Sequence, residues 1–264
     1  MKPLIRRAVA SLLFTAGAGA GAAPGTGEID WQPVGRFEIA RTETTIGQFR
    51  RFAQATGVVT LAERRGGGEV YESGWVRKAG WTWRTPFGAG HVADDREPAV
   101  HLGFDEAVAF CRWAGGRLPT DAEWVEAAYT ERRAKPPAPF IAGRTYPFPG
   151  GERPEGAQCL DDCGPAAAQR AVRHGALLAR GHGPALAGDT PPGVNGLHDM
   201  GGNVWEWVDE PSGGPGAERR TRGGSWWYGQ GPMRAGHLQS KPADTTVVYI
   251  GFRCARDRAA ARPA

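Results

Sequence analysis

Short helical patterns occupy the first half of this sequence, and short strand-like runs occupy the second. Thr45 and Thr120 each precede an apolar pattern and have Gln48 or Glu123 three residues later, the arrangement of a capping box. A further helical pattern runs from 105 to 114 and is followed by glycines. This order predicts an α+β domain whose antiparallel sheets are small compared with its loops.

Each predicted helix has one apolar face that can pack on a core. The first helix ends at Gly57, the second carries Cys111 on its apolar face, and the third buries Trp124. Strands are expected at 37–41, 204–208, 225–228 and 247–254, where apolar and polar residues form short runs between glycine turns. The stretch 61–97 lacks a regular pattern, so we expect long loops held by buried aromatic residues.

Glycine, proline and tryptophan are unusually frequent, with 40, 21 and 10 copies in 264 residues. Glycine and proline favour turns, and each tryptophan needs a large apolar pocket, so the composition favours a loop-rich fold over a helix bundle. The 32 Lys and Arg residues are scattered along the chain and nearly balanced by 28 Asp and Glu residues. This pattern gives no support to nucleic-acid binding.

Residues 1–22 have the features of a signal peptide: Lys2, Arg6 and Arg7, an apolar stretch, and then small residues up to Ala20 and Ala22. We therefore expect a periplasmic or secreted protein, with an uncleaved anchor as the alternative. After the signal is removed, no segment reaches the roughly 18 apolar residues of a membrane helix.

The four cysteines are read as disulfides, because an oxidising compartment favours them over free thiols. Cys159 and Cys163 are close in sequence, whereas Cys111 and Cys254 are far apart, so one local and one long-range bond is the simplest of three pairings. Structural zinc is not expected, because the six His residues have no metal-ligand spacing.

Three sequence blocks resemble the formylglycine-generating enzyme, or sulfatase-modifying factor, family. They are EPAVHLGFDEAVAFCRWAGGRLPTDAEWVEAA, NGLHDMGGNVWEW and RGGSWWYGQGPMRAGH, and the last is followed by IGFRCAR. The resemblance implies the family's C-type lectin-like fold over 37–256, with a lead-in at 23–36 and a tail at 257–264. The segment 166–188 matches poorly and is rich in Ala, Gly, Arg and His, so a mobile insertion is expected there.

The family resemblance implies a disulfide between Cys111 and Cys254. The spacing of the four cysteines along the sequence favours the same pairing. The resemblance implies a structural Ca²⁺ in the second block as well. The ligands carried over are the carboxylates of Asp199 and Glu206 and the carbonyls of Gly202 and Val204. The alternative is that both acids are turn residues that accept bonds from backbone N–H groups.

The family's copper chemistry requires two cysteines after the RGGSW string, whose thiolates bind Cu(I). At the same offsets from Ser225 this chain has Tyr228 and Met233. Cys159 and Cys163 lie outside the block and at another spacing, so the sequence predicts that they do not replace the missing pair. We therefore expect no copper site and no formylglycine-generating activity.

The same block supplies candidates for a groove that holds a peptide or small-molecule ligand: Ser225, Trp227, Tyr228, Arg234 and His237. His237 is a candidate for proton transfer, because its ordinary pKa lies near neutrality. The alternatives are a surface histidine and, for Arg234, a structural ion pair.

Two functions follow from this resemblance. One is an oxidative maturation or accessory factor for a peptide-like substrate, because other members without the copper cysteines resemble periplasmic factors of that kind. The other is a non-catalytic, lectin-like binding module of the cell envelope. Non-haem iron is not supported, since the family members that use it carry iron-binding histidines on an additional helical domain.

Overall fold

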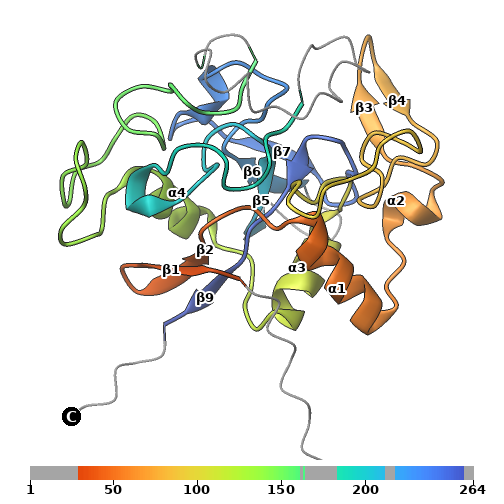
Figure 1. Ribbon diagram of the computed structural model, residues 1–264, viewed down its shortest axis with the longest axis horizontal. Coiled ribbons are helices and arrows are strands. Elements are labelled where there is room, and N and C mark those ends of the chain that lie inside the picture. The colour runs from red at the N-terminus through yellow and green to blue at the C-terminus, as the bar shows by residue number, and fades with distance from the viewer. Residues whose placement is uncertain (1–28, 161–162, 164–182, 212–217, 259–264) are drawn as a thin grey trace, which may run out of the picture.

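A computed structural model describes residues 29–160, 163, 183–211 and 218–258. The chain forms a mixed α+β structure with short helices and three small sheets joined by long loops (Figure 1). The expected signal peptide, 1–22, lies outside the described residues. No helix within the described ranges has the length and apolar character needed to cross a membrane.

The three predicted helices are all present. Helix α1 spans Ile46–Thr56, with the predicted capping box of Thr45 and Gln48 and with Gly57 in a left-handed conformation after its last turn. Helix α3 spans Phe104–Trp113 and α4 spans Asp121–Tyr129, the latter with the predicted capping box that begins at Thr120. Helix α3 begins one residue before its predicted start, because the Gly103 N–H is capped by the Glu106 carboxylate.

The stretch 61–97 is more regular than the sequence indicates. It contains helix α2, Leu61–Arg64, and a hairpin of β3, Glu69–Tyr71, with β4, Trp75–Arg77. Trp83 is fully buried, as expected of an aromatic that holds a loop, but Trp75 is 51% exposed on the hairpin. The expectation that buried aromatics hold this region is therefore wrong for Trp75.

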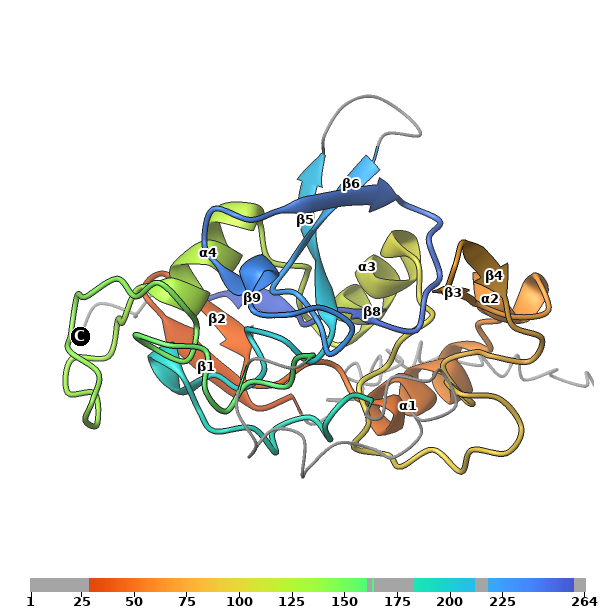
Figure 2. The ribbon, with the colours of Figure 1, turned by 90° about the horizontal axis from the view of Figure 1, so that it is seen from above.

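A four-stranded sheet and a three-stranded sheet form the centre of the molecule. The first has the order β7-β6-β5-β8 and the second β1-β2-β9. The strands are β1 Trp31–Val34, β2 Phe37–Ala40, β5 Trp205–Pro211, β6 Glu218–Arg222, β7 Gln239–Pro242, β8 Ile250–Gly251 and β9 Ala255–Asp257. All neighbours are antiparallel except β5 and β8. Figure 2 shows β5 and β6 with α4 on one side and α3 on the other.

Two strand predictions are corrected. The segment 225–228 is a turn, because Gly223 and Gly224 before it have positive φ angles and lead the chain out of β6. Of 247–254, only Ile250–Gly251 lies in a ladder, and its partner is the start of β5. Strand β6 was not predicted, because its sequence ERRTR has no alternation of apolar and polar residues.

Both disulfides have the predicted pairing. Cys111 of α3 bonds to Cys254, just before β9, across 143 residues, and Cys159 bonds to Cys163 across four. Cys111 and Cys254 are fully buried in the main core, together with Phe49, Phe110 and Phe252. The long-range bond therefore ties the first half of the chain to its last strand.

Part of the expected insertion at 166–188 is corrected. Residues 183–188 are held by hydrogen bonds: the Ala185 N–H donates to Asn203 Oδ1 at 2.8 Å and the Gly188 N–H donates to Asp199 Oδ2 at 2.8 Å. Ala185 is fully buried. Residues 164–182 lie outside the described part of the chain.

Removing the two disulfides separately should destabilise the protein by different amounts. The pair Cys111→Ala and Cys254→Ala should lower the free energy of unfolding by about 5 kcal/mol, and the pair Cys159→Ala and Cys163→Ala by about 2 kcal/mol, because a larger closed loop restricts the unfolded chain more. Urea unfolding followed by tryptophan fluorescence measures both. Equal losses would contradict this assignment of roles.

Candidate functional site

Two of the sequence blocks meet in space. The Gly202 N–H donates to the Gly223 carbonyl at 2.9 Å, and the Trp226 N–H donates to the Asn203 carbonyl at 2.8 Å. Gly223 has φ +97°, and a Cβ there would lie 2.9 Å from the Met200 carbonyl oxygen, so only glycine fits this close approach. The loop that follows β6 is thus fixed against the loop that precedes β5.

The five candidate groove residues do not form one cluster. Ser225 and Trp227 are buried, and the Trp227 N–H donates to Ser225 Oγ at 3.3 Å. Arg234 is exposed and places its guanidinium carbon 4.5 Å from the centre of the Phe148 ring. These three residues do not share a common ligand surface in this structure.

Tyr228 and His237 do come together, on either side of a residue that was not among the candidates. Their rings lie 5.9 Å and 5.8 Å from the ring of Trp205 at the start of β5. Trp205 comes from the GNVWEW string, but the sequence alone indicates only an apolar strand residue at this position. The structure therefore adds Trp205 to the candidate site.

Polar atoms at this junction have no hydrogen-bond partner among the described residues. They are Trp205 Nε1 and His237 Nε2, both inaccessible to solvent. Burial and the Arg222 guanidinium lower the pKa of His237, so its imidazole is neutral near pH 7. Buried polar atoms are nearly always paired, so two that lack partners make this junction unusual among the described residues.

Tyr228 and Met233 occupy the positions at which the resemblance places copper ligands. The Tyr228 carbonyl accepts a bond from the Leu160 N–H at 2.9 Å, and Met233 Sδ lies 3.8 Å from Cys163 Sγ. Cys159 and Cys163 lie outside this block in sequence, but the loop that carries them folds against it in space. Their sulfurs are bonded to each other.

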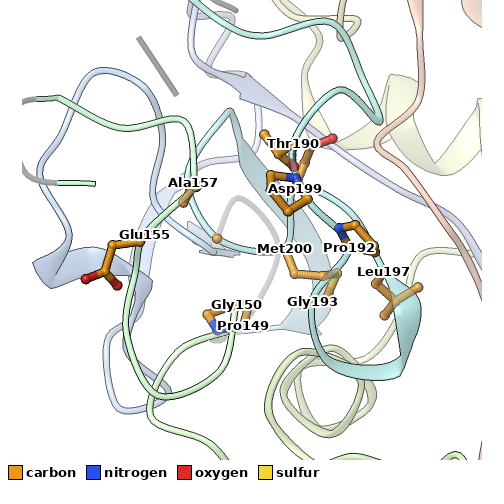
Figure 3. A pocket seen from close by; sticks show the side chains of 13 residues that line it. Pro149, Gly150, Glu155, Ala157, Thr190, Pro192, Gly193, Leu197, Asp199 and Met200 are labelled. Carbon is orange, nitrogen blue, oxygen red and sulfur yellow. Dashed lines mark hydrogen bonds between the residues drawn. The ribbon is translucent and has the colours of Figure 1, made fainter. Parts of the chain in front are cut away.

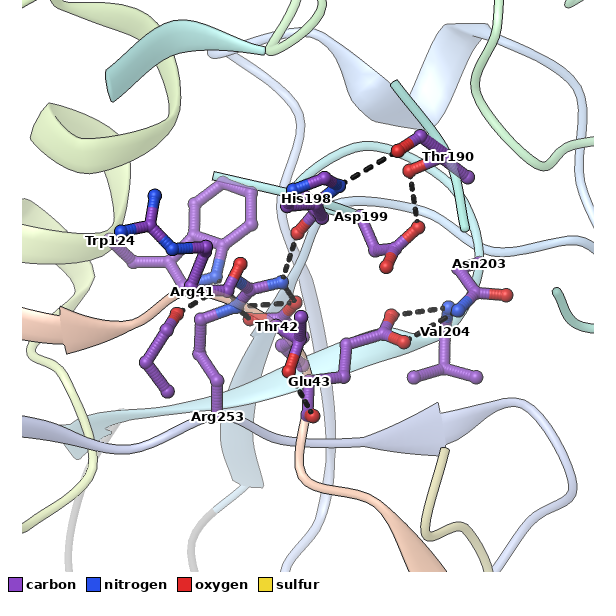
Figure 4. A network of polar contacts seen from close by, with 12 residues as sticks. Arg41, Thr42, Glu43, Trp124, Thr190, His198, Asp199, Asn203, Val204 and Arg253 are labelled. Carbon is purple, nitrogen blue, oxygen red and sulfur yellow. Dashed lines mark hydrogen bonds and ion pairs between the residues drawn. The ribbon is translucent and has the colours of Figure 1, made fainter. Parts of the chain in front are cut away.

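A buried acid cluster, defined as Glu43, Asp199 and Glu206 around Arg253, includes two acids of the GLHDMGGNVWEW stretch. Figure 4 shows Glu43 and Asp199 of this cluster with Arg253. Arg253 Nη2 donates to Glu206 Oε1 at 2.7 Å, and Arg253 Nε donates to Glu206 Oε2 at 2.8 Å. Trp124 Nε1 also donates to Glu206 Oε2, at 2.7 Å. Although burial opposes its charge, the Glu206 carboxylate holds the pKa of Arg253 above its ordinary value.

The other two carboxylates have no cation of their own. Glu43 accepts bonds from the Val204 N–H at 3.0 Å and from Asn203 Nδ2 at 2.6 Å. Burial, and then the charges of Asp199 and Glu206, raise the pKa of Glu43 well above its usual value. Three carboxylates around one guanidinium leave the cluster short of positive charge.

Asp199 joins this cluster to a small cavity. Its carboxylate accepts bonds from Thr190 Oγ1 at 2.6 Å and from the Gly188 N–H, and burial raises its pKa. The cavity has a volume of about 50 Å³, and Asp199 and Thr190 line it together with Ala157 and Met200 (Figure 3). This volume suits an ion or a few water molecules rather than an organic ligand.

The residues present fit a hard cation in their chemistry, but they do not converge on one point. Both Glu206 oxygens are occupied by Arg253 and Trp124, whereas Asp199 faces the cavity. Gly202 has φ +82° and lies too close to the Gln158 carbonyl to carry a side chain. Within the described ranges, no group of three or more His, Cys, Asp or Glu side chains is placed to hold a metal. The Ca²⁺ ligand set stays a prediction.

Comparison with known proteins gives a consistent result over most of the chain. Residues 29–258 match the family model described as the sulfatase-modifying factor enzyme 1-like domain. The chain is 32% identical over 259 residues to the formylglycine-generating enzyme of Streptomyces coelicolor, covering 84% of this chain and 78% of that protein. A Mus musculus protein named inactive C-alpha-formylglycine-generating enzyme 2 is 30% identical over 183 residues, which are 66% of this chain and 54% of that protein.

Among solved structures, PvdO from Pseudomonas aeruginosa aligns with a TM-score of 0.55 at 22% identity, over 84% of this chain and 80% of that chain. This likeness concerns the fold alone. Together with the family match it confirms the predicted fold class, α+β in the C-type lectin-like variant of the formylglycine-generating enzyme fold.

Replacing the guanidinium of the buried acid cluster should destabilise the fold. Arg253→Met should lower the free energy of unfolding by about 3 to 5 kcal/mol at pH 7, because it leaves Glu206 buried and unpaired. Arg253 lowers the pKa values of Glu43 and Asp199, so its removal should raise both further. A carboxyl whose pKa is raised in the folded state loses its contribution to stability as the pH rises, so the loss caused by Arg253→Met should shrink toward about pH 4.

The matched control is Arg256→Met on β9. Arg256 pairs with Glu38 at 2.5 Å but is 41% exposed, so its loss should stay below about 1 kcal/mol. Denaturant unfolding of both variants at pH 7 and pH 4 provides the measurement. If Arg253→Met lowered the free energy of unfolding equally at the two pH values, the proposed excess of carboxylates over guanidinium groups in this cluster would be excluded.

Proposed function

Since the chain belongs to the sulfatase-modifying factor, or formylglycine-generating enzyme, family, we propose that it is an exported oxidative maturation or accessory factor for a peptide-like substrate. We propose further that it works without the family's copper reaction. One observation carries this second part: a phenol and a thioether, those of Tyr228 and Met233, stand where the reaction needs two thiolates. Copper does not fit this donor pair, so no step is assigned to it.

The junction of Tyr228, His237 and Trp205 supports a bound substrate. The half-buried rings of Tyr228 and His237, beside the buried ring of Trp205, suit contact with an apolar or aromatic group of a substrate. With its pKa lowered, the neutral imidazole is able to accept a proton from a substrate N–H or S–H group at neutral pH.

Export is supported by two features. The predicted signal peptide precedes the domain, and all four cysteines are bonded in pairs. Disulfides persist in the periplasm and outside the cell, whereas cytosolic proteins rarely keep them. We therefore place the mature protein in the periplasm or among the secreted proteins.

A non-catalytic binding module is the second candidate, and the β3–β4 hairpin favours it. Tyr71 and Trp75 are 45% and 51% exposed and contact each other edge to face at 5.4 Å. Trp75 also lines a surface cavity of about 430 Å³ together with Arg65, Arg77 and Lys241. An exposed aromatic beside cations is a common feature of ligand-binding surfaces.

We also propose a structural Ca²⁺ at the carried-over ligands: the carboxylates of Asp199 and Glu206 and the carbonyls of Gly202 and Val204. The support is the excess of buried carboxylates over guanidinium groups, because a divalent cation would balance it. When bound, the ion would hold the GNVWEW loop in place, and it takes no part in a reaction.

The copper reaction should be absent. We expect that the purified mature protein, supplied with Cu(I) and dioxygen, leaves a CxPxR peptide unchanged, because no thiolate pair stands at 228 and 233. Mass spectrometry of the peptide distinguishes thiol from aldehyde. As a positive control, the Streptomyces coelicolor relative is assayed in parallel, and aldehyde formation by the present protein would refute the proposal.

Calcium should stabilise the fold. At a Ca²⁺ concentration about 100 times the dissociation constant, the free energy of unfolding should rise by about 2.7 kcal/mol relative to chelator-treated protein. Asp199→Asn should remove most of this gain, whereas Asp189→Asn, whose half-buried carboxylate pairs with Arg96, should keep it. Differential scanning calorimetry measures the shift, and an unchanged midpoint in saturating Ca²⁺ would count against the site.

A further inference from the structure

The Cys159–Cys163 disulfide lies against the loop that carries the candidate site. The backbone of Leu160, next to Cys159, is bonded to the Tyr228 carbonyl at 2.9 Å, and Cys163 Sγ is 3.8 Å from Met233 Sδ. The two cysteines and Met233 share a small hydrophobic cluster with Phe148, separate from the main core. A disulfide therefore stands beside both positions at which the family's chemistry uses sulfur.

This bond contributes little to the architecture. It links residues four apart, whereas Cys111–Cys254 links residues 143 apart within the main core. A bond that closes so short a loop restricts the unfolded chain least. Its loss is therefore compatible with a folded protein.

Backbone bonds hold both ends of the short loop independently of the sulfurs. The Asn203 N–H donates to the Gln158 carbonyl at 2.7 Å, and the Gly156 N–H donates to the Cys163 carbonyl at 3.0 Å. After reduction, the two thiols would stay near each other and remain ready to form the bond again. A pair held in this way is suited to repeated opening and closing.

We propose that Cys159 and Cys163 form a redox-reversible pair that oxidises cysteine thiols of a peptide-like substrate. The proposal rests on the proposed function and names its substrate class, a peptide with two cysteines. It uses an oxidant that the described chain itself contains, the Cys159–Cys163 disulfide bond.

The exchange balances in two steps. A substrate thiolate attacks Sγ of Cys159, the more exposed residue of the pair at 6% against 2%, and the S–S bond breaks to leave a thiolate on Cys163. The second substrate thiolate then attacks the substrate sulfur of the mixed disulfide and releases Cys159. Two electrons and two protons pass to the cysteine pair, and a small-molecule disulfide such as oxidised glutathione takes them up again.

Arg234 lies at the edge of this hydrophobic cluster. Its guanidinium covers the Phe148 ring of the same cluster, one residue along the chain from Met233. A nearby guanidinium lowers the pKa of a thiol and makes it a better leaving group. Arg234 would thus act as a positioning residue that supplies positive charge to the leaving thiolate. This role differs from the structural ion pair that the sequence analysis gives as the alternative.

The first test equilibrates the full mature protein with graded mixtures of reduced and oxidised glutathione. After acid quenching and alkylation, mass spectrometry of peptides reports each disulfide separately. We expect Cys159–Cys163 to pass from mostly oxidised to mostly reduced over a roughly hundredfold change in [GSH]²/[GSSG], while Cys111–Cys254 stays oxidised and circular dichroism stays unchanged. A Cys159–Cys163 bond that opens only together with unfolding would overturn the proposal.

The second test uses a synthetic peptide with two cysteines in a single turnover without glutathione. One peptide disulfide should form for each Cys159–Cys163 bond that is lost, and the double variant Cys159→Ser with Cys163→Ser should form none. Arg234→Gln should slow the reaction severalfold, whereas Arg258→Gln, on the exposed end of the chain beyond β9, should not. A peptide that keeps its thiols would sink this inference, whereas aldehyde formation in the copper assay would sink the proposed function alone.

Discussion

Arg253 is the residue on which the arrangement of the site depends. Its fully buried guanidinium binds the Glu206 carboxylate and the carbonyls of Ala40, Arg41 and His198. These partners come from the end of β2, from the loop before β5 and from β5 itself. One cation thereby joins the end of β2 to the distant segment 198–206, and Cys254, next to it, is bonded covalently to α3. The loop that follows β6 then packs on this fixed frame.

Local signals in the sequence predicted the local structure well. Capping residues and apolar faces are close together along the chain, so the helices that begin after Thr45 and Thr120 and the end at Gly57 follow from a few residues each. Strand β6 and the turn at 225–228 could not be predicted in this way, because pairing partners and close backbone approaches decide them. The burial of Glu43 could not be predicted for the same reason, because its partner Asn203 lies 160 residues away in the sequence.

The candidate site shows the same limit. The motifs indicated a candidate loop, and they showed that the two copper-binding cysteines are missing from it. They did not show that another pair of sulfurs folds against it, because Cys159 and Met233 are far apart in sequence and no pattern links them. Ser225 and Arg234, chosen for proximity in sequence, point to different surroundings. Spatial neighbours, and not neighbours along the chain, define this site.

The central claim is that this member of the family retains the scaffold but does not bind copper beside Tyr228 and Met233. Anomalous diffraction at the copper edge, from crystals of the oxidised protein soaked in Cu(I), tests it most directly. The account predicts no copper peak within bonding distance of either side chain. A peak at this loop, with the metal held by two sulfurs, would contradict it.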